Sequence, residues 1–107
     1  MIRHIVSWNY KDGLTEDEKK ACAKLMQISL IGIQDAIGAE LSVAVIFSNL
    51  LDSSNRDLVL DSLFTSREAL EAYQVHPKHQ ELVGMVKDLL QDRVCVDYDM
   101  ADGYVPL

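Results

Sequence analysis

Cysteine and proline are both scarce, with two of each in 107 residues. Cys22 and Cys95 lie far apart in the sequence and belong to no CxxC motif, so the pattern predicts neither a disulfide framework nor a metal clip. Both cysteines are therefore interpreted as small buried side chains. We expect neither a bound metal nor a cofactor from this pattern.

The sequence also lacks long apolar runs and has few positive charges. No run approaches the roughly 20 apolar residues that cross a bilayer, and residues 1–4 lack the apolar segment of a signal peptide. The 17 acidic residues outnumber the 10 basic ones, and the net charge of -7 opposes binding to nucleic-acid phosphates. We expect a cytoplasmic protein that binds neither membranes nor nucleic acid.

The chain does have enough apolar material for one compact domain. Hydrophobic residues make up 49% of the sequence and charged residues 25%, and no repeat or linker divides it. We expect one domain over residues 1–100 and a C-terminal arm over residues 101–107. The apolar side chains of this arm, with Tyr104, suggest a contact with a second subunit.

The first half of the chain is predicted to form a strand, a long helix and a second strand. Residues 2–10 alternate as a strand does. Thr15 and Glu18 have the capping-box spacing that opens a helix, and Gly38 suits the left-handed residue that ends one. Residues 40–47 are apolar and β-branched on both faces, which favours another strand. Between the two helix signals, one face recurs every three or four positions: Cys22, Leu25, Met26, Ser29, Leu30, Ile33, Ala36 and Ile37.

The second half is predicted to form a strand, two short helices and a final strand. Residues 56–64 form the strand, and Thr65 with Glu68 repeats the capping-box spacing. The first short helix must end at His76, because Pro77 disfavours a helical residue before it and suits the start of the next helix. The buried stripe of that second helix is predicted to be Leu82, Val83, Val86, Leu89 and Leu90. In the final strand, Val94, Val96 and Tyr98 alternate with Cys95, Asp97 and Asp99.

This order of elements predicts an α+β fold, a ferredoxin-like four-stranded antiparallel sheet with its helices on one face. We expect the face that carries Ile2, Val6 and Trp8 to lack a helical cover. The chain has no further strands, so a second copy is expected to cover that face and form a dimeric α+β barrel. Such an interface buries on the order of 1,500 Å² in total.

The segment 64–79, FTSREALEAYQVHPKH, resembles the signature of the stress-responsive A/B-barrel family, also called dimeric α+β barrel proteins. His4, residues 57–60 (DLVL) and residues 93–98 (RVCVDY) also stand where that family places similar residues. The resemblance therefore covers residues 1–100 and implies the dimeric barrel fold. It implies no single activity, because the family ranges from stress-protective plant proteins that form stable oligomers to polyketide cyclases resembling olivetolic acid cyclase.

Three residues are candidates for catalysis: His79, Tyr73 and His4. His79 is expected in the first turn of its helix, where the helix dipole disfavours the imidazolium, so the ring stays neutral near pH 7 and can act as a general base. Tyr73 can donate its hydroxyl to a developing enolate oxygen. The resemblance to the cyclases implies these roles and adds His4 as a further pocket residue. Leu58 departs from the cyclase pattern, because those enzymes carry another pocket histidine there.

Trp8, Leu58, His76 and Asp97 are the candidate binding residues. Trp8 is expected to line the cavity, and Asp97 is the expected carboxylate partner of His4. Each candidate also has a purely structural interpretation, in which Tyr73, His79 and His4 make buried hydrogen bonds and His76 caps a helix. A metal held by His76, His79 and Asp97 is disfavoured, because His76 precedes the helix and shares no helical face with His79.

Three functions stay open. The leading hypothesis is a homodimer whose small apolar pocket binds an aromatic or carbonyl-bearing molecule. The second is a non-catalytic, stress-protective oligomer subunit. The third is an enzyme, resembling a polyketide cyclase or a cofactor-free oxygenase, that uses His79 and Tyr73.

Overall fold

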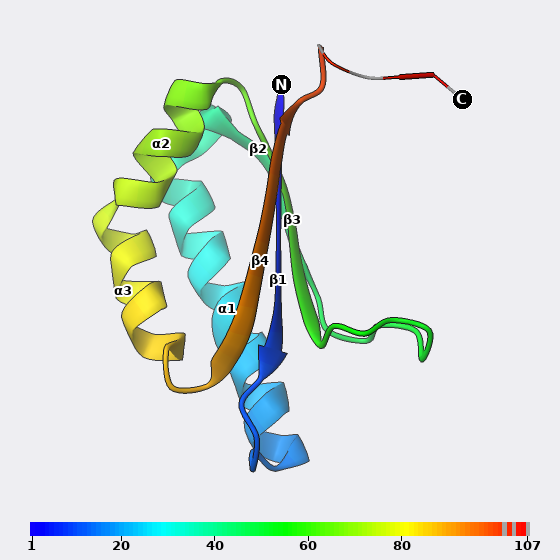
Figure 1. Ribbon diagram of the computed structural model, residues 1–107. Coiled ribbons are helices and arrows are strands. Elements are labelled where there is room, and N and C mark those ends of the chain that lie inside the picture. The colour runs from blue at the N-terminus through cyan, green and yellow to red at the C-terminus, as the bar shows by residue number, and fades with distance from the viewer. Residues whose placement is uncertain (102, 104, 107) are drawn as a thin grey trace.

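The computed structural model describes residues 1–101, 103 and 105–106 (Figure 1). Of the predicted C-terminal arm, Asp102, Tyr104 and Leu107 lie outside the described residues. The elements in chain order are β1 (Ile2–Tyr10), α1 (Glu16–Ile37), the 3-10 helix η1 (Gly38–Glu40), β2 (Leu41–Phe47), β3 (Leu58–Phe64), α2 (Arg67–Val75), α3 (Pro77–Val86) and β4 (Leu90–Asp99).

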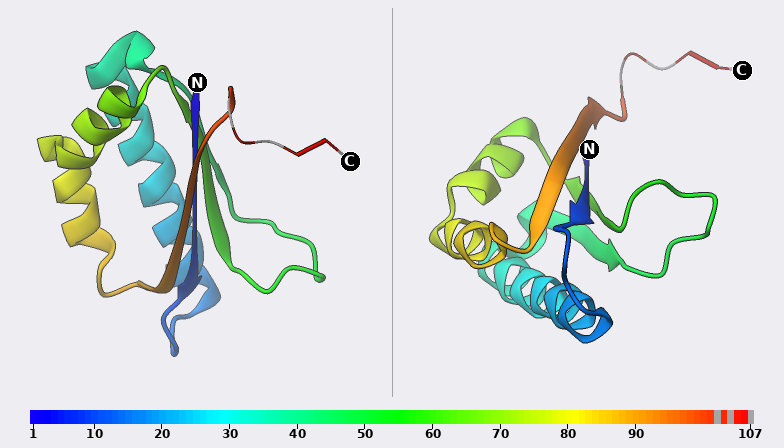
Figure 2. Two further views of the ribbon diagram at one scale, coloured as in Figure 1. Left: turned by 45° about the horizontal axis from the view of Figure 1, so that its top comes forward. Right: turned by 60° about the horizontal axis from the view of Figure 1, so that its bottom comes forward.

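The four strands form one antiparallel sheet in the order β2-β3-β1-β4. All three α-helices lie on the same side of the sheet, and the loop between β2 and β3 projects on the other side (Figures 1 and 2). The predicted ferredoxin-like α+β fold is therefore confirmed. Among the described residues, no helix is long and apolar enough to cross a membrane.

The long helix α1 forms where the capping box predicted it. Glu18 N donates to Thr15 Oγ1 at 3.1 Å, and Thr15 N donates to Glu18 Oε1 at 3.0 Å. At the other end, Gly38 has a φ of 70°, the conformation that glycine adopts without a steric penalty. The helix faces the sheet with its predicted apolar stripe, of which Cys22, Met26, Leu30 and Ile33 are buried.

Two local predictions in the second half are wrong. The cap of α2 is Ser66, whose side chain accepts from Ala69 N at 3.1 Å, while the Thr65 hydroxyl instead donates to Glu40 at 3.0 Å. The chain also leaves α3 at Val86, so Leu90 begins β4 and is buried there rather than on a helix. Val83, predicted to be buried on α3, is half exposed.

The prediction of which sheet face lacks a cover is also wrong. Ile2 and Val6 are 6% and 2% exposed and belong to the core, because their side chains point towards the helices. The error arose because strand alternation shows that two faces exist and not which of them the helices cover. A second sheet is therefore expected on the opposite face, which carries the alternate residues of each strand.

That opposite face, called here the open face, has apolar side chains on every strand. On this face, an ion pair joins the two central strands, β1 and β3. Arg3 of β1 donates to the Asp61 carboxylate of β3 from two nitrogens, at 2.6 and 3.1 Å. Its six exposed apolar side chains lie on the two edge strands: Val43, Val45, Phe47, Val94, Val96 and Tyr98.

Candidate functional site

A cavity of about 410 Å³ lies between the helices and the sheet, on the side of β1 and β4. Met26 and Leu30 of α1 and Leu82 and Val86 of α3 form much of its apolar wall. Most of the surface that faces it is apolar, as is typical of small-molecule sites, although several polar and charged residues also line it. The remaining lining residues are His4, Val6, Trp8, Leu60, Tyr73, His79, Val83, Lys87, Leu90, Gln91, Asp92 and Arg93.

The break between α2 and α3 brings two of the predicted catalytic residues together. Tyr73 lies in the last turn of α2 and His79 in the first turn of α3, because Pro77 starts the new helix between them. The two ring centroids are 4.5 Å apart, and the ring of His4 lies 6.1 Å from that of Tyr73. The structure therefore places His4, Tyr73 and His79 around one cavity.

Burial keeps both Tyr73 and His79 uncharged near neutral pH. Burial raises the pKa of Tyr73 to about 12, although the positive charge of Arg93 opposes this rise. Burial also lowers the pKa of His79; the Gln74 backbone opposes this fall, while His4 and Arg93 act in the same direction as burial. The neutral state of His79 was predicted from the helix dipole, and the loss of water around the buried ring is a cause that the structure adds. Tyr73 is therefore a proton donor, and neutral His79 has a nitrogen free to accept a proton.

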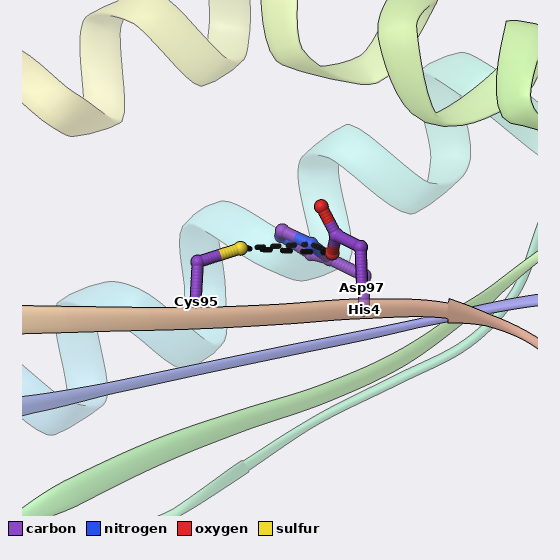
Figure 3. A group of neighbouring side chains, drawn as sticks. All are labelled: His4, Cys95 and Asp97. Carbon is purple, nitrogen blue, oxygen red and sulfur yellow. Dashed lines mark hydrogen bonds and ion pairs between the residues drawn. The ribbon is translucent and has the colours of Figure 1, made fainter.

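His4 is buried and bonded to Asp97, its predicted carboxylate partner. Its Nδ1 hydrogen-bonds to Asp97 Oδ1, and because an ionised carboxylate only accepts, Nδ1 carries the proton. Cys95 Sγ lies 3.6 Å from the same Asp97 oxygen and 3.8 Å from His4 Nδ1 (Figure 3). Partial loss of water around the sulfur, together with the negative charge of Asp97, raises the pKa of the Cys95 thiol, although Arg93 opposes this rise.

The cysteine prediction is half correct. Cys22 is buried in α1, but Cys95 is exposed, because its strand β4 is at the edge of the sheet. Within the described part of the chain, Cys95 joins His4 and Asp97 as a group whose ligating atoms all lie within 4.8 Å of one another. The metal site considered from the sequence consisted of His76, His79 and Asp97, and only Asp97 belongs to this group.

The candidate binding residues have different positions. Trp8 lines the cavity from β1. Leu58 is fully buried opposite Trp8 in the sheet and is not among the lining residues. His76 caps α3 by accepting from Lys78 N at 3.1 Å, and Asp97 contacts the cavity only through His4.

Sequence reasoning missed the positive side chains at the cavity. Lys87 and Arg93 both line it, in a protein that is acidic overall. Asp92, which precedes Arg93 near the start of β4, also lines the cavity. Its φ of 56° is a left-handed conformation that aspartate tolerates better than most residues. The strand alternation places Arg93 on the same face as Cys95 and Asp97, and this pattern is the signal that identifies it.

Comparisons with known proteins add a family and a fold. The family model described as "Stress Responsive A/B Barrel Domain" matches residues 2–100. No curated protein matches the chain significantly.

Several solved structures share the fold at low sequence identity. A dimeric ferredoxin-like protein of unknown function from Bacteroides fragilis has a TM-score of 0.83 and 20% identity, over 92% of this chain and 95% of that one. A dimeric ferredoxin-like protein from Thermobifida fusca, also of unknown function, has a TM-score of 0.68 and 25% identity, over 92% and 90%. A putative antibiotic biosynthesis monooxygenase from Nitrosomonas europaea has a TM-score of 0.74 and 18% identity, over 92% and 97%.

Proposed function

Because the chain belongs to the stress responsive A/B barrel domain family, we propose that it is a homodimer whose subunits each bind a small aromatic or carbonyl-bearing molecule. The observation that carries this proposal is the cavity of about 410 Å³ with Tyr73 and His79 on its wall. Its volume falls within the range of about 300–1,000 Å³ that is typical of ligand pockets.

The open face supports the homodimer. An exposed area of 6951 Å² exceeds the roughly 6,000 Å² expected of a folded 12.0 kDa monomer. Part of this excess comes from the projecting loop at residues 48–57, where Leu51 is 79% exposed (Figure 2). The exposed apolar side chains of the open face contribute a further part, and a standard interface, which buries about 800 Å² per partner, would cover them.

The lining residues support an aromatic or carbonyl-bearing ligand. The apolar wall and the ring of Trp8 favour a flat apolar body. Tyr73 is a neutral hydrogen-bond donor with the positive charge of Arg93 near it, and Lys87 adds a second positive charge to the lining. These groups together favour a ligand oxygen that bears partial negative charge, as a carbonyl oxygen does.

A pair of matched probes tests the ligand proposal. Binding of 1-naphthol and 1-acetylnaphthalene is followed by calorimetry and by NMR shifts of cavity residues. Val83→Trp fills the cavity and is expected to abolish saturable binding of both probes, because Val83 is a half-exposed lining residue that accepts a larger side chain. Val75→Trp places the same ring on the outer surface of α2 and should bind both probes like the wild type. Absence of saturable wild-type binding, or unchanged binding by Val83→Trp, contradicts the proposal.

An enzyme is the second candidate, favoured by the 4.5 Å separation of the Tyr73 and His79 rings. His79 would remove a proton beside a ligand carbonyl, and Tyr73 would donate a hydrogen bond to the enolate oxygen that forms. The name of the Nitrosomonas neighbour supports an oxygenase as an alternative within this candidate.

The enzyme candidate is tested by deuterium exchange at the methyl group of 1-acetylnaphthalene in heavy water. His79→Gln is expected to reduce exchange to the uncatalysed rate, and Tyr73→Phe to reduce it by about 100-fold, the usual range for one lost donor or general base. The outer-surface variant Glu81→Ala, at an exposed position of α3, should exchange at the wild-type rate. Wild-type exchange no faster than buffer rejects the enzyme but leaves the binding proposal intact.

A further inference from the structure

The group formed by His4, Cys95 and Asp97 brings three different metal-ligating atoms together on the sheet (Figure 3). These atoms are an imidazole nitrogen, a sulfur and a carboxylate oxygen, all within 4.8 Å of one another. The group does not include Tyr73 or His79, but its His4 ring also lines the cavity, so the group lies at the edge of the candidate ligand site.

Regular strand pairing holds the three side chains in place. His4 on β1 lies directly opposite Asp97 on β4, and Cys95 precedes Asp97 by two residues, which puts it on the same face. All three point towards the helices (Figure 3). A site built on paired strands loses less conformational freedom on binding than one built on a loop, so these ligands are preorganised.

We propose that His4, Cys95 and Asp97 bind one zinc ion. Zinc accepts sulfur, nitrogen and oxygen ligands at about 2.0–2.3 Å, and tetrahedral angles then place ligand atoms roughly 3.3–3.6 Å apart. The sulfur already lies 3.6 Å from Asp97 Oδ1 and 3.8 Å from His4 Nδ1, whereas the hydrogen-bonded Nδ1 and Oδ1 atoms must move apart to admit the ion. Magnesium and calcium prefer a shell of oxygen atoms, which this group lacks.

The ion takes the place of the proton between His4 and Asp97. The ring proton of His4 moves from Nδ1 to Nε2, so the imidazole stays neutral and its Nδ1 lone pair binds the ion. The thiol proton of Cys95 leaves to solvent, and the resulting thiolate and the Asp97 carboxylate together balance the charge of the zinc. The Asp97 side chain is 38% exposed, which gives the ion an entry path and the carboxylate room to turn.

Three protein ligands leave one tetrahedral position open for water. This arrangement is that of an accessible zinc site and not of a closed structural one. The hydrophobic core is made of other side chains than these three ligands, so zinc is expected to add stability and not to be needed for folding.

Cobalt titration of the reduced, EDTA-treated full chain tests the site directly. Cobalt substitutes for zinc, and a thiolate ligand adds a charge-transfer band that no carboxylate or imidazole site produces. We expect one such band at one ion per chain, displaced by zinc. Cys95→Ser should lose the band and bind zinc more than about tenfold more weakly, because loss of even a supporting residue costs that much.

Two further variants complete the test. Cys22→Ala removes the other cysteine, which is buried in α1, and should retain the full band and the wild-type zinc affinity. Asp97→Asn should keep the band but weaken zinc binding. Circular dichroism verifies that each variant is folded. A wild-type chain with no saturable band, or a band that survives in Cys95→Ser, overturns the proposal.

Discussion

The two faces of the sheet differ in how much of their apolar surface the chain itself covers. On the helix side, Leu58, Phe64 and Ile33 are completely buried, and the space left over is the cavity beside β1 and β4. On the open face, the apolar side chains of the edge strands remain about half exposed, and the Arg3–Asp61 ion pair joins the central strands. One face therefore holds the core and the candidate site, while the other leaves its apolar side chains without a cover from the described residues.

This difference teaches that fold stability and assembly depend on different residues. The covered face needs close packing, because a lost methylene group there leaves a void. In the proposed dimer, the open face needs only to be apolar and free of unpaired charge, because a partner sheet would supply the packing. Changes to the two faces should therefore affect different measurements.

The largest expected effect is on the covered face. Leu58→Ala removes a fully buried side chain and should lower the free energy of unfolding by about 2–5 kcal/mol. Urea denaturation at one fixed protein concentration measures this change. Ile28→Ala, on the exposed side of α1, should change the same quantity by less than about 0.5 kcal/mol. Equal losses in the two variants would contradict the packing difference between these positions.

The next effect is on the open face. Val96→Lys puts a charge where a partner sheet is expected to exclude water, and should weaken the dimer about 100-fold, or about 2.7 kcal/mol. Sedimentation velocity over a dilution series measures the dissociation constant. Val75→Lys makes the same change on the outer surface of α2 and should leave the dimer intact. A dimer equally stable in both variants would show that the open face is not the interface.

A smaller effect is expected at the ion pair. Asp61→Asn leaves the Arg3 charge without a counter-ion in the interface and should weaken the dimer roughly tenfold, or about 1.4 kcal/mol. The double variant Arg3→Met, Asp61→Leu should recover most of this loss, because two apolar side chains replace the desolvated pair. If the double variant forms a weaker dimer than Asp61→Asn, the attraction within the ion pair stabilises the dimer. The pair would then do more than neutralise two charges in the interface.

The smallest effect is a pH dependence on the covered face. Burial lowers the pKa of His79 in the folded state, so the unfolded chain binds this proton more readily. Stability should therefore fall as the pH drops below the ordinary histidine pKa of about 6.5 towards the lower folded value, and should be unaffected above it. Urea midpoints of wild type and His79→Gln, measured in EDTA, isolate this contribution. A wild-type midpoint that falls no more steeply than that of the variant contradicts it.

Much of the fold and part of the site were predictable from local pattern. The capping box at Thr15, the helix break at Pro77 and the alternation of β4 each depend on residues close in sequence. Those patterns were enough to place Tyr73 and His79 on either side of one break. The capping box at Thr65 had the same spacing and was wrong, because the neighbouring Ser66 satisfies the helix amide instead. Spacing alone does not choose between two adjacent hydroxyl side chains.

The sequence by itself determined the class of fold, the order of its elements and the residues that share each strand face. Only the tertiary structure decided which face the helices cover, that Cys95 is exposed beside His4 and Asp97, and that Arg93 reaches the cavity. The physical reason is that alternation is a property of one strand, whereas cover and proximity depend on which strand lies at the edge and how each is paired.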